Sequence, residues 1–506
     1  MIVIEAASSG DELFFGIVAP SGTDTSSVAD SLSQSLSAVQ YDLIVVKLSE
    51  LIATATDIDT SALLEDERIE TLQQAGNDLC ARELAGDAVV RLAVAKVDQI
   101  RRSRNEESGT DLNGPLEGVA FLFSSLKRIA EVRALRQIYG PWFVLLGVEA
   151  PISQREGYLA AKIKTSRPSF EQSQCRERAR TLIEKDRHEV GEPWGQNVLQ
   201  TFPYSDAFIS AKDPGVLGAS LDRVIGLFFG EPAITPNVTE WAMSAAHTAA
   251  MRSGSTSRRV GAAIVLHGDL IAVGVNQFPA FGGGQLFPTT SPDARDVTAA
   301  LDTNKDEIRS IAADLLKRLA AAGKLSTECA TEIEAGRIDW LTREIVENDL
   351  AGSKLTQVIE YQAPVHAEVS AILSASRQGT SVVGADLYVT TYPCHLCMRE
   401  ILTAGIHSIV YLEPYPKSHA QAMYVDLIET EVPRPDRLPI TPYIGIAPWS
   451  YPNWFSHPNR EAERPTLRPL PTAVLGSPLS TLHEREQSYI ADTTILDTPT
   501  PATGEL

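Results

Sequence analysis

The chain has 506 residues, 43% of them hydrophobic, which is too long for one hydrophobic core and predicts two or three globular domains. Its 44 Lys and Arg face 65 Asp and Glu, and the resulting net charge of −21 argues against nucleic acid as a substrate. No apolar run reaches the ~18 residues of a membrane helix and the first ten residues lack a secretory pattern, so we expect a cytoplasmic protein without membrane contact.

Apolar runs alternate with helical segments through the first half of the chain. Strands are expected at 13–19, from 41, at 118–123 and at 142–150, with helical material at 64–104 and 126–140. Such alternation is typical of a parallel sheet covered by helices on both faces. We therefore predict an N-terminal α/β domain over residues 1–230.

The first expected strand leads into a loop that partly matches a phosphate-binding P-loop. The segment "GIVAPSGTDTSSV" offers a turn and hydroxyl groups, with Ser21, Gly22, Thr23, Asp24 and Thr25 as candidate nucleotide-binding residues. Thr23 stands where the lysine of a P-loop belongs, and the upstream glycine is displaced by one residue. Both departures favour a regulatory nucleotide with Mg²⁺ over kinase activity. A loop with a purely structural role is the alternative.

A new pattern begins after the segment "GEPAITPN" at 230–237. A helix is expected at 239–252, strands at 260–266, 270–275, 385–391 and 408–412, and further helices from about 365 and from 394. Residues 293–350 are charged and helical and are expected to form an insertion. We assign residues 231–457 to a second domain and 458–506 to an extended or disordered tail.

Two of the five cysteines, Cys394 and Cys397, stand three positions apart in "YPCHLC". They can be a redox pair, half of a metal site, or a coincidence. Upstream, "VHAEVSAIL" places His366 and Glu368 at the start of another expected helix. Two facing helix N-termini can present His366, Cys394 and Cys397 to one ion, which leaves the fourth position of a tetrahedral zinc site for water.

The remaining carboxylate supplies a proton carrier. Glu368 lies two residues from the ligand histidine, so it can reach a zinc-activated water without binding the metal. H-x-E followed by P-C-x-x-C is the signature of zinc nucleobase deaminases, in which water attacks the ring carbon and ammonia leaves. A redox pair normally follows the first strand of its domain, whereas this pair comes late. His395, inside the pair, is expected to point away from the metal.

The segments "VHAEVSAIL", "TTYPCHLCMREILTAGI", "SRRVGAAIV" and "AVGVNQFP" resemble the deoxycytidylate deaminases. The resemblance implies an αβα cytidine-deaminase-like C-terminal domain. It also implies that Asn276 contacts the deoxyribose and that Arg252 contacts the substrate phosphate. Ser370 stands where the family usually has Asn, a departure in the helix that carries Glu368.

"SLKRIAEVRALRQIYGPWF" and "YLEPYPKSHA" resemble a bacterial antiphage family that fuses a P-loop kinase-like domain to a deoxycytidylate deaminase. The resemblance implies deamination of dCTP or dCMP, depletion of dCTP during infection, a homo-oligomer such as a hexamer, and an inhibitor that restrains activity. Two alternatives stay open. One is a deaminase of RNA or single-stranded DNA, and the other is a nucleotide-sensing module whose deaminase domain serves assembly.

Overall fold

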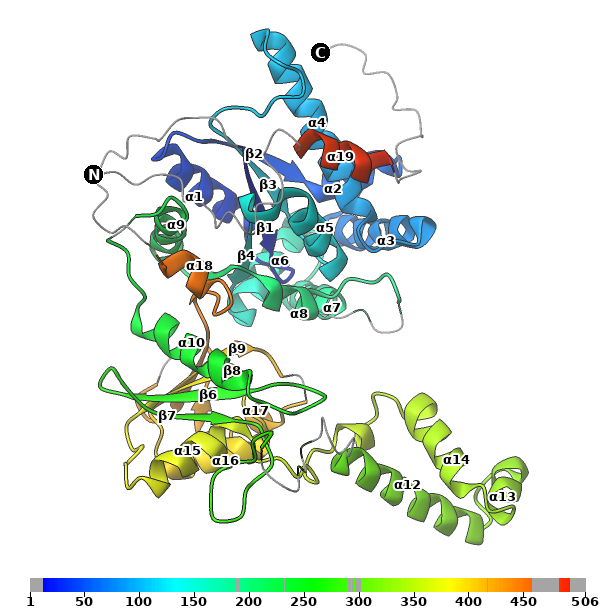
Figure 1. The fold of residues 1–506 in the computed structure, drawn as a ribbon. Helices are drawn as coiled ribbons and strands as arrows, with labels where there is room; N and C mark the ends of the chain where they lie inside the picture. The colour runs from blue at the N-terminus through cyan, green and yellow to red at the C-terminus, as the bar shows by residue number, and fades with distance from the viewer. Residues whose placement is uncertain are drawn as a thin grey trace. The chain divides into compact units, whose positions relative to one another are not determined.

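The computed structural model describes residues 12–187, 189, 192–231, 233–289, 293, 295, 302–415, 417–432, 434–456 and 482–491. The chain divides into two compact units, Met1–Glu240 with Ile444–Leu506, and Trp241–Tyr443 (Figure 1). Each unit is a sheet with helices packed against it, which confirms the predicted α/β class. The domain boundaries at 230 and 457 stay predictions.

The first unit is built on a six-stranded sheet in the order β12-β5-β4-β1-β3-β2. Its strands are β1 (Leu13–Val18), β2 (Asp42–Lys47), β3 (Val119–Ser124), β4 (Phe143–Glu149), β5 (Ala207–Ser210) and β12 (Gly445–Ile446). Neighbouring strands among β1 to β5 pair in parallel, whereas β12 is antiparallel to β5. The central strand β1 lies between β3 and β4.

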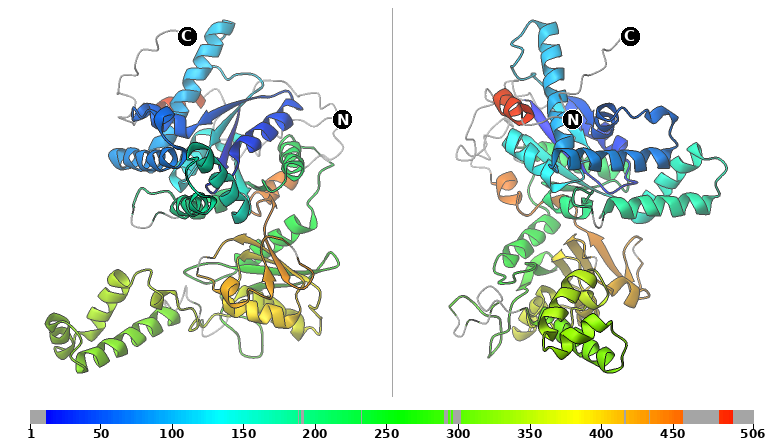
Figure 2. Two further views of the ribbon diagram at one scale, coloured as in Figure 1. Left: turned by 180° about the vertical axis from the view of Figure 1, so that it is seen from behind. Right: turned by 90° about the vertical axis from the view of Figure 1, so that its right-hand side faces the viewer.

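Helices cover both faces of this sheet, with α1 and α9 on one side and α4 and α5 on the other (Figure 2). The helices of the unit are α1 (Thr25–Ser37), α2 (Leu48–Ala55), α3 (Glu65–Glu83), α4 (Ala88–Ser108), α5 (Ile129–Tyr139), α6 (Ile152–Ser166), α7 (Gln172–Arg187), α8 (Val198–Thr201), α9 (Pro214–Phe228), α18 (Tyr451–Phe455) and α19 (Leu482–Ala491). The expected helical stretch at 64–104 is thus two helices, α3 and α4.

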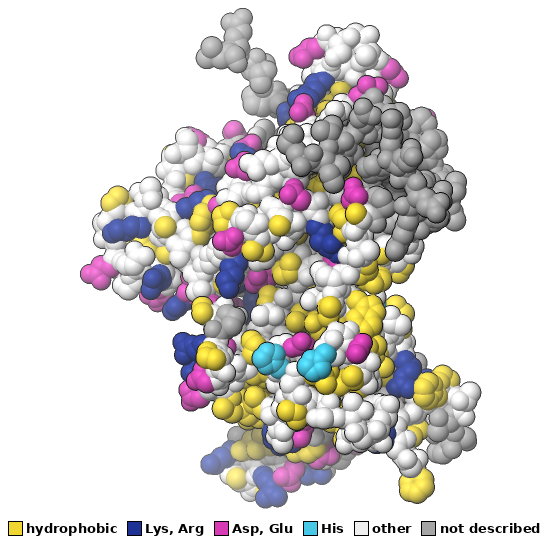
Figure 3. Space-filling model, turned by 90° about the vertical axis from the view of Figure 1, so that its left-hand side faces the viewer, with side chains coloured by type: hydrophobic (Ala, Val, Ile, Leu, Met, Phe, Trp, Pro, Cys, Tyr) yellow, Lys and Arg dark blue, Asp and Glu magenta, His cyan; other side chains and the backbone are white. Residues whose placement is uncertain are grey.

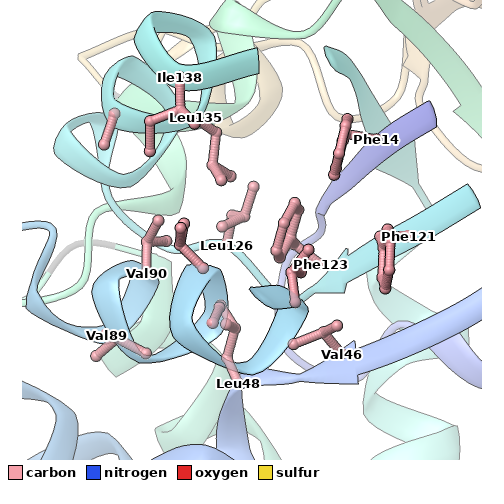
Figure 4. Close-up of a cluster of buried hydrophobic side chains, with 14 of the residues drawn as sticks. Phe14, Val46, Leu48, Val89, Val90, Phe121, Phe123, Leu126, Leu135 and Ile138 are labelled. Atoms are coloured by element: carbon pink, nitrogen blue, oxygen red, sulfur yellow. The ribbon is translucent and has the colours of Figure 1, made fainter. Parts of the chain in front are cut away.

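Alternate side chains of β1 enter two separate cores, because successive residues of a strand point to opposite faces. Phe14 and Val18 pack with α4 and α5, where Phe121 and Phe123 of β3 join them (Figure 4). Phe15 and its same-face neighbours pack with α1 and α9. Burial on both faces explains why β1 reads in the sequence as a continuous apolar run.

The C-terminal segment returns to the first unit and differs from the expected extended tail. Residues 482–491 form α19, which packs on α4 and α5. Its Glu486 is fully buried and pairs with Arg101 of α4, which also binds the buried Glu12 (Nη2–Oε2 2.7 Å). The composition of the tail could not predict this helix, because its burial depends on the ion pair between Glu486 and the distant Arg101. The other tail residues lie outside the described part of the chain.

The second unit holds a six-stranded sheet in the order β10-β11-β9-β8-β6-β7. Its strands are β6 (Gly261–Leu266), β7 (Asp269–Val275), β8 (Asp386–Thr391), β9 (Ser408–Glu413), β10 (Ile428–Glu429) and β11 (Leu438–Pro442). β6 is antiparallel to both β7 and β8, and β8, β9, β11 and β10 follow in parallel.

The helices associated with this unit include two that carry the signature motifs. They are α10 (Val238–Ala250, which begins at the end of the first unit), α12 (Thr303–Ala321), α13 (Thr327–Glu334), α14 (Ile338–Glu344), α15 (Ala367–Arg377), α16 (His395–Ala404) and α17 (Ala420–Met423). α12, α13 and α14 form the helical part of the segment expected as an insertion, and they contact one another. None of the described helices is both long enough and apolar enough to cross a bilayer.

Candidate active site

Two helix starts bring the signature residues together. His366 immediately precedes α15 and Cys394 immediately precedes α16, and each has the extended backbone of a helix N-cap. The two helices contact each other on the same sheet. The facing helix N-termini expected from the sequence are therefore present, and Cys397 lies in the first turn of α16.

His366, Cys394 and Cys397 form a compact group of potential metal ligands whose ligand atoms all lie within 4.8 Å of one another. His366 Nδ1 is 3.2 Å from Cys397 Sγ and 3.3 Å from Cys394 Sγ. In a tetrahedral zinc site, N and S ligands are separated by about 3.5 Å. Both cysteines are buried and free of disulfides. The residues therefore fit a zinc ion.

The histidine is also oriented as a metal ligand would be. Its Nε2 lies 2.6 Å from Gln362 Oε1, which leaves Nδ1 to face the thiols. A second partner of this kind fixes the ring and its tautomer in metal sites. Gln362 escaped the sequence reasoning because it belongs to no recognised motif and lies in the irregular segment before α15.

The thiols are electrostatically unlike one another. The pKa of Cys394 is lowered to about 4, because its sulfur accepts a hydrogen bond from the Cys397 thiol and another from His366. The pKa of Cys397 is raised well above its usual value, because that thiol donates to Cys394 and is buried. The cluster already stabilises one thiolate, the form in which cysteine binds metal.

Glu368 lies in the first turn of α15 and is only 4% exposed. Burial raises the pKa of its carboxyl group to about 7, although the nearby His366 opposes the rise. A carboxyl group so tuned can both accept and donate a proton near neutral pH. The structure thus places Glu368 beside the three ligands but outside the ligand group itself.

Gly274 of β7 lets α15 approach the sheet closely. A Cβ at this position would lie 2.1 Å from the carbonyl oxygen of Ala367 and 2.4 Å from the amide nitrogen of Ala371, both in the backbone of α15. Those atoms cannot yield without moving the helix that follows His366. The close approach of β7 and α15 is therefore a condition for the geometry of the cluster.

Gly274→Ala should consequently lower the zinc content well below that of the unchanged protein, because α15, which follows His366, must shift relative to β7. Elemental analysis of the purified chain measures this. Gly218→Ala is the matched control, since a Cβ there meets nothing within 4 Å in a helix and should leave zinc unchanged. Equal zinc in both variants would show that α15 tolerates the shift.

Asn276, expected at the deoxyribose, lies next to the ligand histidine. Gln277 and Val365 form a backbone bridge (N–O 3.2 and 3.0 Å), which holds this segment beside His366. The Asn276 amide donates to the carbonyl of Arg258 (2.8 Å) and accepts from the amide of Val260 (2.7 Å). It therefore braces the segment before β6, and sugar contact stays a prediction.

Arg252, expected at the substrate phosphate, contacts the glycine-rich loop after β7. Its guanidinium donates to Gln285 and lies 4.4 Å from the centre of the Phe287 ring. Burial lowers its pKa. No contact in the described structure joins Arg252 to the three-ligand cluster, so its phosphate role also stays a prediction.

A second arginine, which the sequence reasoning passed over, contacts the loop that is tied to α16. Arg258 lies 5.4 Å from the centre of the Tyr415 ring, in the loop after β9. Burial raises the pKa of Tyr415, and the charge of Cys394 adds to the rise. Ser418 of the same loop donates to the carbonyl of Pro393 (2.8 Å), which ties the loop to α16.

His395, which was expected to point away from the metal, contacts residues other than the three potential ligands. Its Nε2 is 3.4 Å from Glu360 Oε1 and its ring packs against His419 with centroids 5.6 Å apart. It does not belong to the three-residue ligand group.

The candidate nucleotide loop after β1 forms several hydrogen bonds within itself. The Thr23 amide donates to Pro20 (3.2 Å), the Thr25 amide to Thr23 (3.0 Å), and the N-cap Asp24 accepts from Ser27. Gly22 has φ +86°, and a Cβ there would lie 2.6 Å from the Arg155 carbonyl oxygen. Of the predicted cradle of amides over Ser21–Thr25, those of Thr23 and Thr25 donate within the loop and that of Ser21 donates to Asp186 (2.7 Å), so nucleotide binding at this loop stays a prediction.

Comparison with known proteins shows similarity in the part of the chain that contains the cluster. The family model described as the cytidine and deoxycytidylate deaminase zinc-binding region matches residues 236–413. Deoxycytidylate deaminase of Enterobacteria phage T2 is 48% identical over 54 residues, 11% of this chain and 29% of that protein. ComE operon protein 2 of Bacillus subtilis (strain 168) is 47% identical over 58 residues, 12% of this chain and 30% of that protein.

The chain thus spans less than a third of the length of these two relatives. Among solved structures, dCMP deaminase from the cyanophage S-TIM5 in complex with dCMP and dUMP is 16% identical. That match covers 42% of this chain and 99% of the other, with a TM-score of 0.23. Over residues 236–413, which include His366, Glu368, Cys394 and Cys397, this chain is similar to the cytidine and deoxycytidylate deaminase zinc-binding region.

Proposed function

We propose that this protein is a zinc-dependent deaminase that converts deoxycytidine nucleotides, dCMP, dCTP or both, into deoxyuridine nucleotides and ammonia. The observation that carries the proposal is the group of His366, Cys394 and Cys397 at two helix starts with the buried Glu368 beside it. The reaction consumes one water: a C4–O bond forms, the C4–N4 bond breaks and ammonia leaves.

Zinc held by the three ligands would supply the electrophilic activation of water at neutral pH. The chain itself does the proton work. The Glu368 carboxylate takes one proton from the attacking water and gives it to N3 of the base. It then takes the second proton from the new hydroxyl group on C4 and gives it to N4, which leaves as ammonia. Its burial keeps bulk water from competing for these transfers, and Gln362 holds the His366 ring in place throughout.

A mononucleotide substrate suits the surface charge of this chain better than a polynucleotide does. The chain has 65 Asp and Glu residues but only 44 Lys and Arg residues, which gives a net charge of −21. On the face seen in Figure 3, charged side chains of both signs are scattered and no continuous basic band is visible. A polynucleotide substrate needs a basic track for its phosphates.

The resemblance of the sequence alone supports the finer parts of the proposal. These are a preference that includes dCTP, a role in depleting dCTP during phage infection, a cytoplasmic location, a homo-oligomer, and an inhibitor that restrains the activity. A regulatory nucleotide with Mg²⁺ at the N-terminal unit belongs to the same group.

A substrate panel tests the proposal. Product chromatography should show uracil nucleotides from dCMP or dCTP, and little product from cytidine, deoxycytidine or single-stranded DNA and RNA. Turnover of the oligonucleotides alone would instead identify a polynucleotide deaminase, and no turnover of any cytosine compound by zinc-loaded protein would reject the enzyme.

Metal analysis tests the ligand assignment separately. Cys394→Ala and Cys397→Ala should each lose most of the zinc, because two protein ligands cannot hold the ion as three do. Cys329→Ala is the control, since Cys329 lies in α13 outside the ligand group and its loss should leave about one zinc per chain. Full zinc in the Cys394 and Cys397 variants would refute the assignment.

A further inference from the structure

The central sheet of the first unit has a topological switch point between β1 and β3. β1 connects through α1 to β2 on one side, whereas the neighbouring β3 connects through α5 to β4 on the other side. α1 and α5 accordingly pack on opposite faces of the sheet. In open α/β sheets, ligands bind where loops diverge in this way, outside the carboxyl ends of the strands.

The side-chain carboxylate of Asp186 lies between the loops that follow β1 and β3. Asp186, at the end of α7, is fully buried there. Its Oδ2 accepts from the Ser21 amide in the loop after β1 (2.7 Å). Its Oδ1 lies 2.8 Å from Nζ of Lys127, which comes from the loop after β3.

A second contact fixes the position of the Lys127 ammonium group beside the loop after β1. Its Nζ also donates to the carbonyl of Ala19, the residue after β1 (3.0 Å), and its side chain is 16% exposed. Lys127 thus brings an ammonium group to the loop after β1, the loop in which Thr23 occupies the position of the P-loop lysine. It reaches the loop from another strand, which is why the linear motif fails.

We propose that Lys127 and the Ser21 amide form an anion site that accepts a phosphate group of a nucleotide, and that Asp186 is the internal anion that fills this site. An ammonium group and a backbone N–H bind a carboxylate and a phosphate by the same charge-assisted hydrogen bonds. The helix N-terminus of α1 is not the receptor, because Asp24 already caps it. The inference is independent of the deaminase activity.

The element that carries Asp186 can be separated from the central cores. α7 packs through Cys175, Ala179, Leu182 and Ile183 against α6 in a small hydrophobic cluster of its own. Ion pairs from Arg178 and Arg167 to Asp66 join this hairpin to α3. Withdrawal of Asp186 would therefore leave the two main cores intact, and a phosphate group must displace it or bind where it has left.

Asp186→Asn tests the site, because the amide keeps the shape of the carboxylate but cannot neutralise Lys127. We expect the full-length variant to melt lower than the unchanged protein and to bind tripolyphosphate or ATP roughly tenfold tighter or more. Calorimetric titration and thermal unfolding measure both effects. Asp30→Asn, the same change at an exposed position of α1, should behave like the unchanged protein.

The double variant Lys127→Met with Asp186→Asn should lose the gain in anion binding while recovering stability, because no charge is left unpaired. Inorganic phosphate, tripolyphosphate, ATP and dCTP as separate ligands distinguish a simple phosphate site from a nucleotide site. Should Asp186→Asn fail to fold, Lys127→Met alone must remove the residual ATP binding of the unchanged protein. Binding by Asp186→Asn no tighter than by the unchanged protein, or equal binding in the double variant, overturns the proposal.

Discussion

Glu368→Gln should lower the rate of deamination by about 10²–10⁴-fold, the contribution of a positioned acid–base group, while leaving the zinc content unchanged. The amide keeps the size of the side chain in a position that is only 4% exposed, but it can neither take a proton from water nor return one to the base. Steady-state deamination of dCMP and dCTP, with elemental analysis of the same samples, measures both quantities.

Glu360→Gln provides the control in the same neighbourhood. Glu360 approaches His395 rather than the ligands, and its side chain is half exposed, so its replacement should change the rate little. If Glu368→Gln and Glu360→Gln retain similar activity, Glu368 does not carry the protons and the mechanism proposed above fails. If Glu368→Gln loses zinc as well as activity, Glu368 supports the metal site rather than the chemistry.

Arg101→Met should destabilise the first unit by about 3–5 kcal/mol, the usual cost of removing one partner from a buried ion pair. The guanidinium is 1% exposed and Glu12 and Glu486 are fully buried. Burial alone would lower the pKa of Arg101, but its hydrogen bonds to the two carboxylates outweigh burial and raise it. Without Arg101, both carboxylates lose their cation in a nonpolar setting. Urea unfolding followed by tryptophan fluorescence measures the change.

Arg102→Met, at the next position of α4, is the matched control. Arg102 is 46% exposed and pairs with Asp98 at the surface, so its loss should cost less than about 1 kcal/mol. Adding Glu12→Gln and Glu486→Gln to Arg101→Met should restore much of the stability, because the unpaired charges are then gone. Equal costs for Arg101→Met and Arg102→Met would mean that the buried network contributes little.

The sequence predicted best those features that depend on neighbouring residues. The apolar runs of β1, β3 and β4 are continuous because both faces of each strand are buried, so each is visible as a strand without knowledge of its partners. His366 and Cys394 were placed at helix starts for a similar reason, since the motifs themselves include the first turn of each helix. Local sequence patterns were therefore sufficient to predict the residues of the candidate metal cluster.

Features that depend on contacts distant in sequence were not predictable in this way. Lys127 and Asp186 are separated by 59 positions and belong to no common motif, so only the fold shows that one neutralises the other. The role of Gly274 depends on where the backbone of α15 crosses β7. α19 is amphipathic for one short helix only, and its burial depends on Arg101, 385 positions upstream of Glu486.

The return of the C-terminal segment to the first sheet also fixes an order of events during synthesis. Because ribosomes make the chain from its N-terminus, Arg101 and the edge strand β5 emerge long before Glu486 and β12 exist. Residues 241–443 are translated in between and can gather their own core first. Until Glu486 and β12 have been made, residues 1–240 can fold only with Arg101 paired to Glu12 alone and with the outer edge of β5 unpaired.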